Sequence, residues 1–140
     1  MAYYFAIITT AKRNNIIYWI ATVWFSLGMV ASGILQLIQQ KDEVVFMAAL
    51  GYPAYFLSII GAWKLLGVIA VLAPKYPLVK EWAYAGFFLP MTGAFFSHIG
   101  SGDTFGEMFP AIFLTALIVI SWYFRPESRR LAGVPGIAQK

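Results

Sequence analysis

The stretch AYFLSIIGAWKLLGVIAVL, from Ala54 to Leu72, decides the fold of this chain, because it is apolar except for one lysine near its middle, Lys64. A helix needs about 20 mainly apolar residues to cross the hydrocarbon core of a bilayer, so the stretch predicts a membrane-spanning helix. A lysine at the bilayer centre costs on the order of 3 kcal/mol, and from mid-helix its side chain is too short to reach either headgroup layer. Lys64 therefore serves a ligand or catalytic site, fixes the packing register of a buried interior, or lines a water-filled recess.

The composition extends this prediction to the rest of the chain. Of its 140 residues, 61% are hydrophobic and 11% are charged, whereas soluble domains carry about 25% charged residues. We expect an all-α, four-transmembrane-helix bundle that forms a single membrane domain over residues 1–140. The spans are expected at about 16–38, 54–72, 82–99 and 108–124, with a short interfacial helix at about 42–50.

Residue spacing predicts how these spans pack. Small and polar residues of the first span recur at helical spacing and are expected to face the bundle: Thr22, Ser26, Met29, Gly33 and Gln36. In the second span, Gly61 and Gly67 permit close contact between helices. We expect Met1–Asn15 to lie along the membrane surface and Glu127–Lys140 to form a mobile cytosolic tail.

The basic residues predict the orientation. Outside the spans, one side of the predicted topology carries a single lysine, Lys41, and the other side carries all the remaining cations: Lys12, Arg13, Lys75, Lys80, Arg125, Arg129, Arg130 and Lys140. Because cytoplasmic loops are enriched in Lys and Arg, both termini are expected in the cytoplasm, with the chain in a bacterial inner membrane. Topology and anionic headgroups thus explain the basic charge, and we expect no nucleic-acid partner.

Residue types restrict the chemistry of the chain. There is no cysteine, so disulfides, thiolate catalysis and dithiol relays are excluded. One histidine and six carboxylates do not favour a metal site built by the protein, which needs about three converging ligands. Any electron chemistry must therefore belong to a bound molecule.

A set of polar residues is expected near the outer half of the bundle. Helical side chains tilt toward their own N-terminus, so Lys64 points outward, and the spans place Gln36, Ser97 and His98 in the same half. Asp103 follows in the outer loop, and no acidic residue lies within the four spans. Lys64 is then neutral, hydrated or bound to an anion.

Roles for these residues follow from their chemistry. Lys64 is the candidate catalytic base or electrostatic anchor, and His98, which titrates near neutral pH, is the candidate proton relay. Trp63, Gln36, Ser97 and Asp103 are the candidate ligand-binding residues. The alternatives are that His98 only makes an interfacial hydrogen bond and that the aromatic residues only pack the bundle.

Four motifs carry a resemblance to a known family. They are LGYPAYF at residues 50–56, GAWKLLG at 61–67, PLVKEWAYAG at 77–86, and GAFFSH at 93–98 followed by Gly102 and Asp103. In their order and spacing, over about residues 16–124, they resemble the DoxX-like family of small four-helix membrane proteins. That family takes its name from subunits of an archaeal thiosulfate:quinone oxidoreductase, and the broader superfamily includes a eukaryotic chaperone for receptor assembly.

The resemblance implies a membrane bundle with a quinone or lipid pocket, and it leaves several functions open. The first is binding of a quinone-type or other amphiphilic small molecule; if the protein is an enzyme, it is a quinone-linked oxidoreductase component. The second is a non-enzymatic assembly or interaction factor for another membrane protein. Transport is less favoured, because a four-helix monomer offers little room for alternating access, although a dimer could supply it, and no convincing inverted repeat relates the two helix pairs. The expected partners are membrane lipid, the amphiphile, and a second copy of the chain or another membrane protein.

Overall fold

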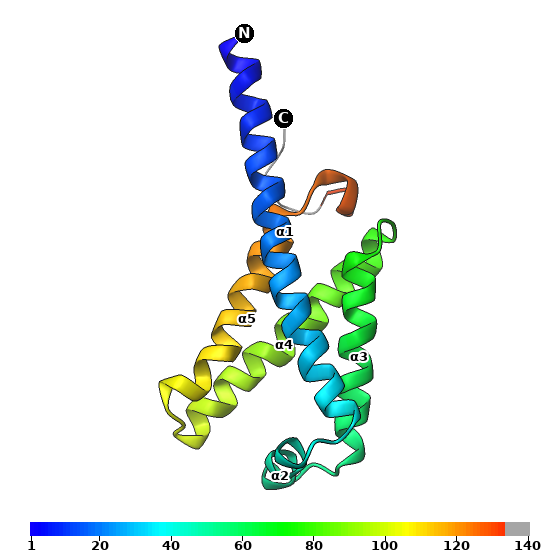
Figure 1. Ribbon diagram of the computed structural model, residues 1–140, viewed down its shortest axis with the longest axis vertical. Coiled ribbons are helices and arrows are strands. Elements are labelled where there is room, and N and C mark those ends of the chain that lie inside the picture. The colour runs from blue at the N-terminus through cyan, green and yellow to red at the C-terminus, as the bar shows by residue number, and fades with distance from the viewer. Residues whose placement is uncertain (134–140) are drawn as a thin grey trace.

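The computed structural model describes residues 1–133, and for residues 2–7 it describes the backbone only. Its elements are α1 (Ala2–Leu37), α2 (Lys41–Ala49), α3 (Tyr55–Leu72), α4 (Pro77–Ser101), α5 (Phe105–Phe124) and the short 3-10 helix η1 (Glu127–Arg129) (Figure 1). No strand occurs in this part of the chain. The all-α class predicted from the sequence is therefore confirmed.

Three helices are long and apolar enough to cross a membrane among the described residues. They are Ile8–Leu37 within α1, the whole of α3 and the whole of α5. Helix α4 contains the third predicted span but carries polar residues at both ends, among them Lys80, Glu81 and His98. The chain thus has the helices of a membrane protein, and a fourth crossing by α4 stays a prediction.

The four long helices pack as a ring. Helix α1 contacts α3 and α5, and α4 contacts the same two helices from the other side. One core cluster draws on all four: Phe25, Met29, Val68, Val71, Tyr84, Phe87 and Ile118. Toward the end where α2 lies, α4 diverges from α3 (Figure 1), and this divergence decides which predicted site residues can meet.

The predicted packing face of α1 is confirmed. Its five residues, from Thr22 to Gln36, are all buried. Helix α3 comes very close to this face at Gly61, where an added Cβ would lie 2.6 Å from the carbonyl oxygen of Gly33. Small residues let helix backbones approach in a bilayer, and Gly33 and Gly61 use that freedom here.

Helix α1 differs from the expectation at its N-terminal end. It runs without a break from Ala2, so no boundary occurs near Ile16. Its 36 residues correspond to about 54 Å at the α-helical rise, against about 30 Å of hydrocarbon. The first turns of α1 therefore extend past the other helices (Figure 1). They do not form a separate surface segment, because they continue the same helix and no proline interrupts it.

The segment after α5 also differs from the expected free tail. Arg129 Nη1 donates to the carbonyl oxygens of Val71, Leu72 and Ala73 at 3.4, 3.2 and 3.3 Å. Its guanidinium lies 4.9 Å from the ring centroid of Trp19. The expectation is thus wrong for this stretch, because cations satisfy the open carbonyl groups at the C-terminus of α3. For residues 134–140 the expectation lies outside the described residues.

Candidate functional site

A cavity of about 470 Å³ opens between α3 and α4. Its walls are almost entirely apolar, and Lys64 is the one charged residue among those that line it. Trp63 and Trp82 also line it from opposite helices, and their side chains are 69% and 71% exposed at its rim. Two of the sequence-predicted site residues, Trp63 and Lys64, therefore meet at this cavity.

Small side chains explain why the cavity forms. At Gly67 an added Cβ would lie 2.6 Å from Phe87 Cζ, so α3 and α4 touch there. At Gly86, the residue that precedes Phe87 in α4, nothing lies within 4 Å of an added Cβ. Because Gly86 and Ala83 cannot fill the space between the helices, the cavity stays open beside Lys64.

The side chain of Lys64 has a hydrogen-bond partner on α1 and an acidic neighbour on α2. Lys64 Nζ donates to Ser32 Oγ at 3.1 Å. One helical turn farther along α1, Gln36 Nε2 donates to Glu43 Oε2 at 3.3 Å, and the charge of Glu43 acts on Lys64. Lys64, Ser32, Gln36 and Glu43 are called the Lys64 cluster below. Gln36, predicted from the sequence, belongs to it.

Glu43 is an acidic neighbour of Lys64 that was not assigned to it from the sequence. It lies outside the spans, as expected, but α2 brings it against α1. The sequence contains a signal for this residue, since an acid in the loop between two spans is a candidate counter-ion for a lysine within one of them. The direction in which Glu43 points depends on how α2 docks against α1. That docking cannot be predicted from the residues next to Glu43 in the sequence.

The remaining predicted residues lie elsewhere. His98 Nδ1 and Asp103 Oδ2 lie within hydrogen-bond distance, 2.6 Å apart, and the His98 ring stacks on Phe46 of α2 with centroids 6.2 Å apart. Ser97 is exposed. None of the three lines the cavity, because α4 has diverged from α3 by this point (Figure 1). The residues that were expected to line a single pocket therefore lie in two separate places.

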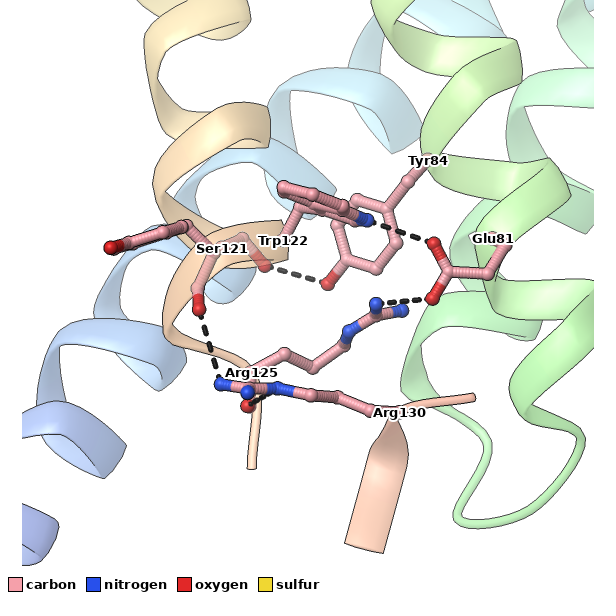
Figure 2. Close-up of polar contacts among 7 residues, drawn as sticks. Glu81, Tyr84, Ser121, Trp122, Arg125 and Arg130 are labelled. Atoms are coloured by element: carbon pink, nitrogen blue, oxygen red, sulfur yellow. Dashed lines mark hydrogen bonds and ion pairs between the residues drawn. The ribbon is translucent and has the colours of Figure 1, made fainter. Parts of the chain in front are cut away.

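A second polar cluster, which we did not predict, lies at the other end of the bundle (Figure 2). Glu81 Oε2 accepts from Trp122 Nε1 at 2.8 Å, and Glu81 Oε1 forms an ion pair with Arg125. Arg125 is fully buried, and its guanidinium carbon lies 5.0 Å from the ring centroid of Tyr84. The pair joins α4 to the end of α5.

Hydroxyl groups continue this cluster into the core. Tyr84 Oη and Ser121 Oγ are 2.7 Å apart, Ser121 Oγ and Thr22 Oγ1 are 2.6 Å apart, and Thr22 Oγ1 donates to the Tyr18 carbonyl at 2.6 Å. The chain of hydroxyls therefore links α4, α5 and α1. Buried polar groups of this kind stabilise a bundle only when each has a partner.

Sequence reasoning assigned the basic residues at this end to topology alone. Lys80 is fully buried and donates to the carbonyl oxygens of Ala70 and Val71 at 2.8 and 3.0 Å, and to that of Ala73. Lys80 precedes the third predicted span; burial lowers its pKa to about 8, and the charges of Arg129 and Arg125 act in the same direction. Lys80 and Arg129 therefore satisfy open carbonyl groups at the C-terminal end of α3.

Metal ligands do not gather anywhere in the described part of the chain. No group of three or more His, Cys, Asp or Glu residues there is placed to hold a metal ion. Both clusters above contain one carboxylate each.

Comparison with known proteins places this arrangement in a family. The model of the DoxX-like family matches residues 20–121, a segment that includes the cavity, the Lys64 cluster and Glu81. No curated protein and no solved structure gives a significant match to the chain. The matched segment covers well over half of the 140 residues. The apolar helices and this match together show that the chain is a membrane protein of the DoxX-like family.

Proposed function

We propose that the protein binds a quinone-type or other amphiphilic small molecule in the cavity between α3 and α4, in support of membrane redox chemistry. The observation that carries the proposal is a single lysine, Lys64, on the wall of an otherwise apolar cavity of about 470 Å³. Cavities that hold small molecules measure about 300–1,000 Å³ and combine apolar walls with few polar groups. The cavity meets both criteria.

The lining suits a ligand with a flat head and an apolar tail. Trp63, Trp82 and Phe87 offer aromatic surface beside Lys64, and aromatic rings pack well against one another. Lys64 Nζ uses one of its three protons on Ser32, so others can reach a carbonyl or hydroxyl oxygen of the ligand. The redox change belongs to the ligand itself, and the protein binds and orients it.

Two different changes to the cavity test this function. Lys64→Met removes the ammonium, and Gly86→Leu fills open space while it leaves Lys64 in place. The control is Lys75→Met, which removes an exposed lysine outside the cavity. Each protein is purified gently from membranes, and its bound lipids are extracted and identified by mass spectrometry.

We expect one defined amphiphile in the wild type and the Lys75→Met control, and its loss from both cavity variants. The same lipids in all four proteins would overturn the proposal. Loss from Lys64→Met with retention in Gly86→Leu would place the ligand elsewhere and would also overturn it.

The orientation and a fourth crossing by α4 belong to the same proposal. Support comes from three basic residues that lie at one end of the bundle: Lys80, Arg125 and Arg129. In a bacterial inner membrane, the end that carries the basic residues faces the cytoplasm. Because the chain has no cysteine, single cysteines at Ser101 and Ser128 can be labelled in intact cells with an impermeant maleimide. Labelling of Ser101→Cys alone is expected, and labelling of Ser128→Cys would refute the orientation.

A separate observation favours assembly as a second candidate function. One face of α4 exposes small residues, with nothing within 4 Å of an added Cβ at Gly86 or Gly93. Such faces suit close packing against another helix in a bilayer. Gly93 does not line the cavity, so Gly93→Leu should release a co-purifying membrane protein and leave the amphiphile bound. Unchanged co-purification would remove this candidate.

A further inference from the structure

Two opposite charges are held on consecutive turns of α1. Lys64 donates to Ser32, and Glu43 accepts from Gln36. Ser32 and Gln36 are four residues apart, which is about 6 Å along a helix axis. The carboxylate of Glu43 is thus fixed near the ammonium of Lys64, and Gln36, only 8% exposed, is the side chain that fixes it.

No other carboxylate among the described residues is an acidic neighbour of Lys64. Lys64 is the one charged residue that lines the cavity. The neighbouring acid on α2, Asp42, is exposed and accepts a hydrogen bond from Gln40 Nε2 at 2.9 Å. Glu43 alone therefore supplies the counter-charge, and Asp42 offers a matched control on the same helix.

We infer that Glu43 makes this cavity select uncharged amphiphiles over anionic ones. The inference rests on the proposed function and specifies the chemical class of its ligand. The carboxylate of Glu43 is held on the turn of α1 next to the one that Lys64 contacts, so an anionic head at Lys64 would bring a second negative charge close to Glu43 in apolar surroundings. A hydroxyl or carbonyl oxygen accepts a hydrogen bond from Lys64 and adds no charge.

The test compares two ligands with the same tail. Hexadecanol is uncharged, and hexadecanesulfonate is anionic at every accessible pH. Apparent dissociation constants are measured by native mass spectrometry on the full chain in detergent, for the wild type, Glu43→Gln and Asp42→Asn. Glu43→Gln keeps the size of the side chain and removes its charge.

The wild type and Asp42→Asn are expected to prefer hexadecanol. Glu43→Gln should shift the ratio of the two dissociation constants toward the sulfonate by at least about tenfold, because a neighbouring unit charge acts strongly in apolar surroundings. Gln36→Leu, which removes the bond that holds Glu43, should shift the ratio in the same direction by a smaller factor.

Failure of this inference can be told from failure of the proposed function. Equal binding of both ligands by the wild type, or an equal ratio in Glu43→Gln, would overturn the selectivity while the cavity remains a ligand site. An equal shift in Asp42→Asn would also overturn it, since the effect would then come from overall charge. Absence of binding to the wild type, or binding that survives Lys64→Met, would overturn both.

Discussion

The contact between α1 and α3 at Gly61 gives a sharp test of the bundle. In Gly61→Ala the new methyl group would lie 2.6 Å from Gly33 O and 3.0 Å from the backbone nitrogen of Leu37. An ordinary contact between carbon and oxygen is about 3.3 Å or longer, so the helices must separate by several tenths of an ångström. Both neighbours are backbone atoms, which cannot rotate away as the end of a side chain can.

Two opposing effects determine how much Gly61→Ala changes the free energy of unfolding. Alanine is about 1 kcal/mol more favourable than glycine within a helix. Overpacking in a well-packed interior costs up to about 3 kcal/mol, and a small separation forfeits a quarter or more of each dispersion contact. We therefore expect Gly61→Ala to lower the free energy of unfolding by about 2 kcal/mol.

The matched control is Gly93→Ala on α4, where nothing lies within 4 Å of the added Cβ. This variant should gain about 1 kcal/mol from helix propensity alone. Unfolding is followed by tryptophan fluorescence as SDS is added to the protein in a mild detergent. If Gly61→Ala proves as stable as Gly93→Ala, the close approach of α1 and α3 does not exist in the folded protein.

Three further predictions concern the opposite end of the bundle. Glu81→Gln should cost about 3 kcal/mol, because it leaves the buried Arg125 without its counter-charge; a loss below about 1 kcal/mol in the same unfolding assay would show that the pair is unimportant. Tyr84→Phe removes the hydroxyl that bonds Ser121 and should cost about 1 kcal/mol, whereas no loss would mean that the hydroxyl chain does not stabilise the fold. Burial lowers the pKa of Lys80 from 10.5 to about 8, so the folded protein binds fewer protons than the unfolded chain between these values. Its stability should rise with pH across that window, and Lys80→Met should remove the slope; a slope that survives the substitution would assign it to another group.

The spans illustrate what local pattern can predict. A run of apolar residues around Lys64 fixes a membrane helix because the length of the run matches the bilayer. The buried face of α1 follows from the 3.6-residue period, as Thr22 and Met29 show. Thr104 and Glu107 have the capping-box spacing in the sequence and form that box at the start of α5. Each of these features depends on residues within a few turns of one another.

The candidate site depended on features that no local pattern carries. Lys64 was recognisable as the unusual charge, but the approach of Glu43 to it requires α2 to dock against α1. His98 was grouped with Lys64 because both were assigned to the same half of the bilayer. Depth in the membrane does not fix lateral distance, and the divergence of α4 from α3 separates them (Figure 1).

The sequence by itself determined that this chain is a helical membrane protein with one exceptional charge, because hydrophobic length and helical period are local properties. Only the tertiary structure decided which partners the charges have: Glu43 near Lys64, and Glu81 with Arg125 across 44 residues of sequence. The physical reason is that ion pairs act over a few ångströms in space. Those separations are set by where the glycines let helices touch and by the directions in which the helices then diverge.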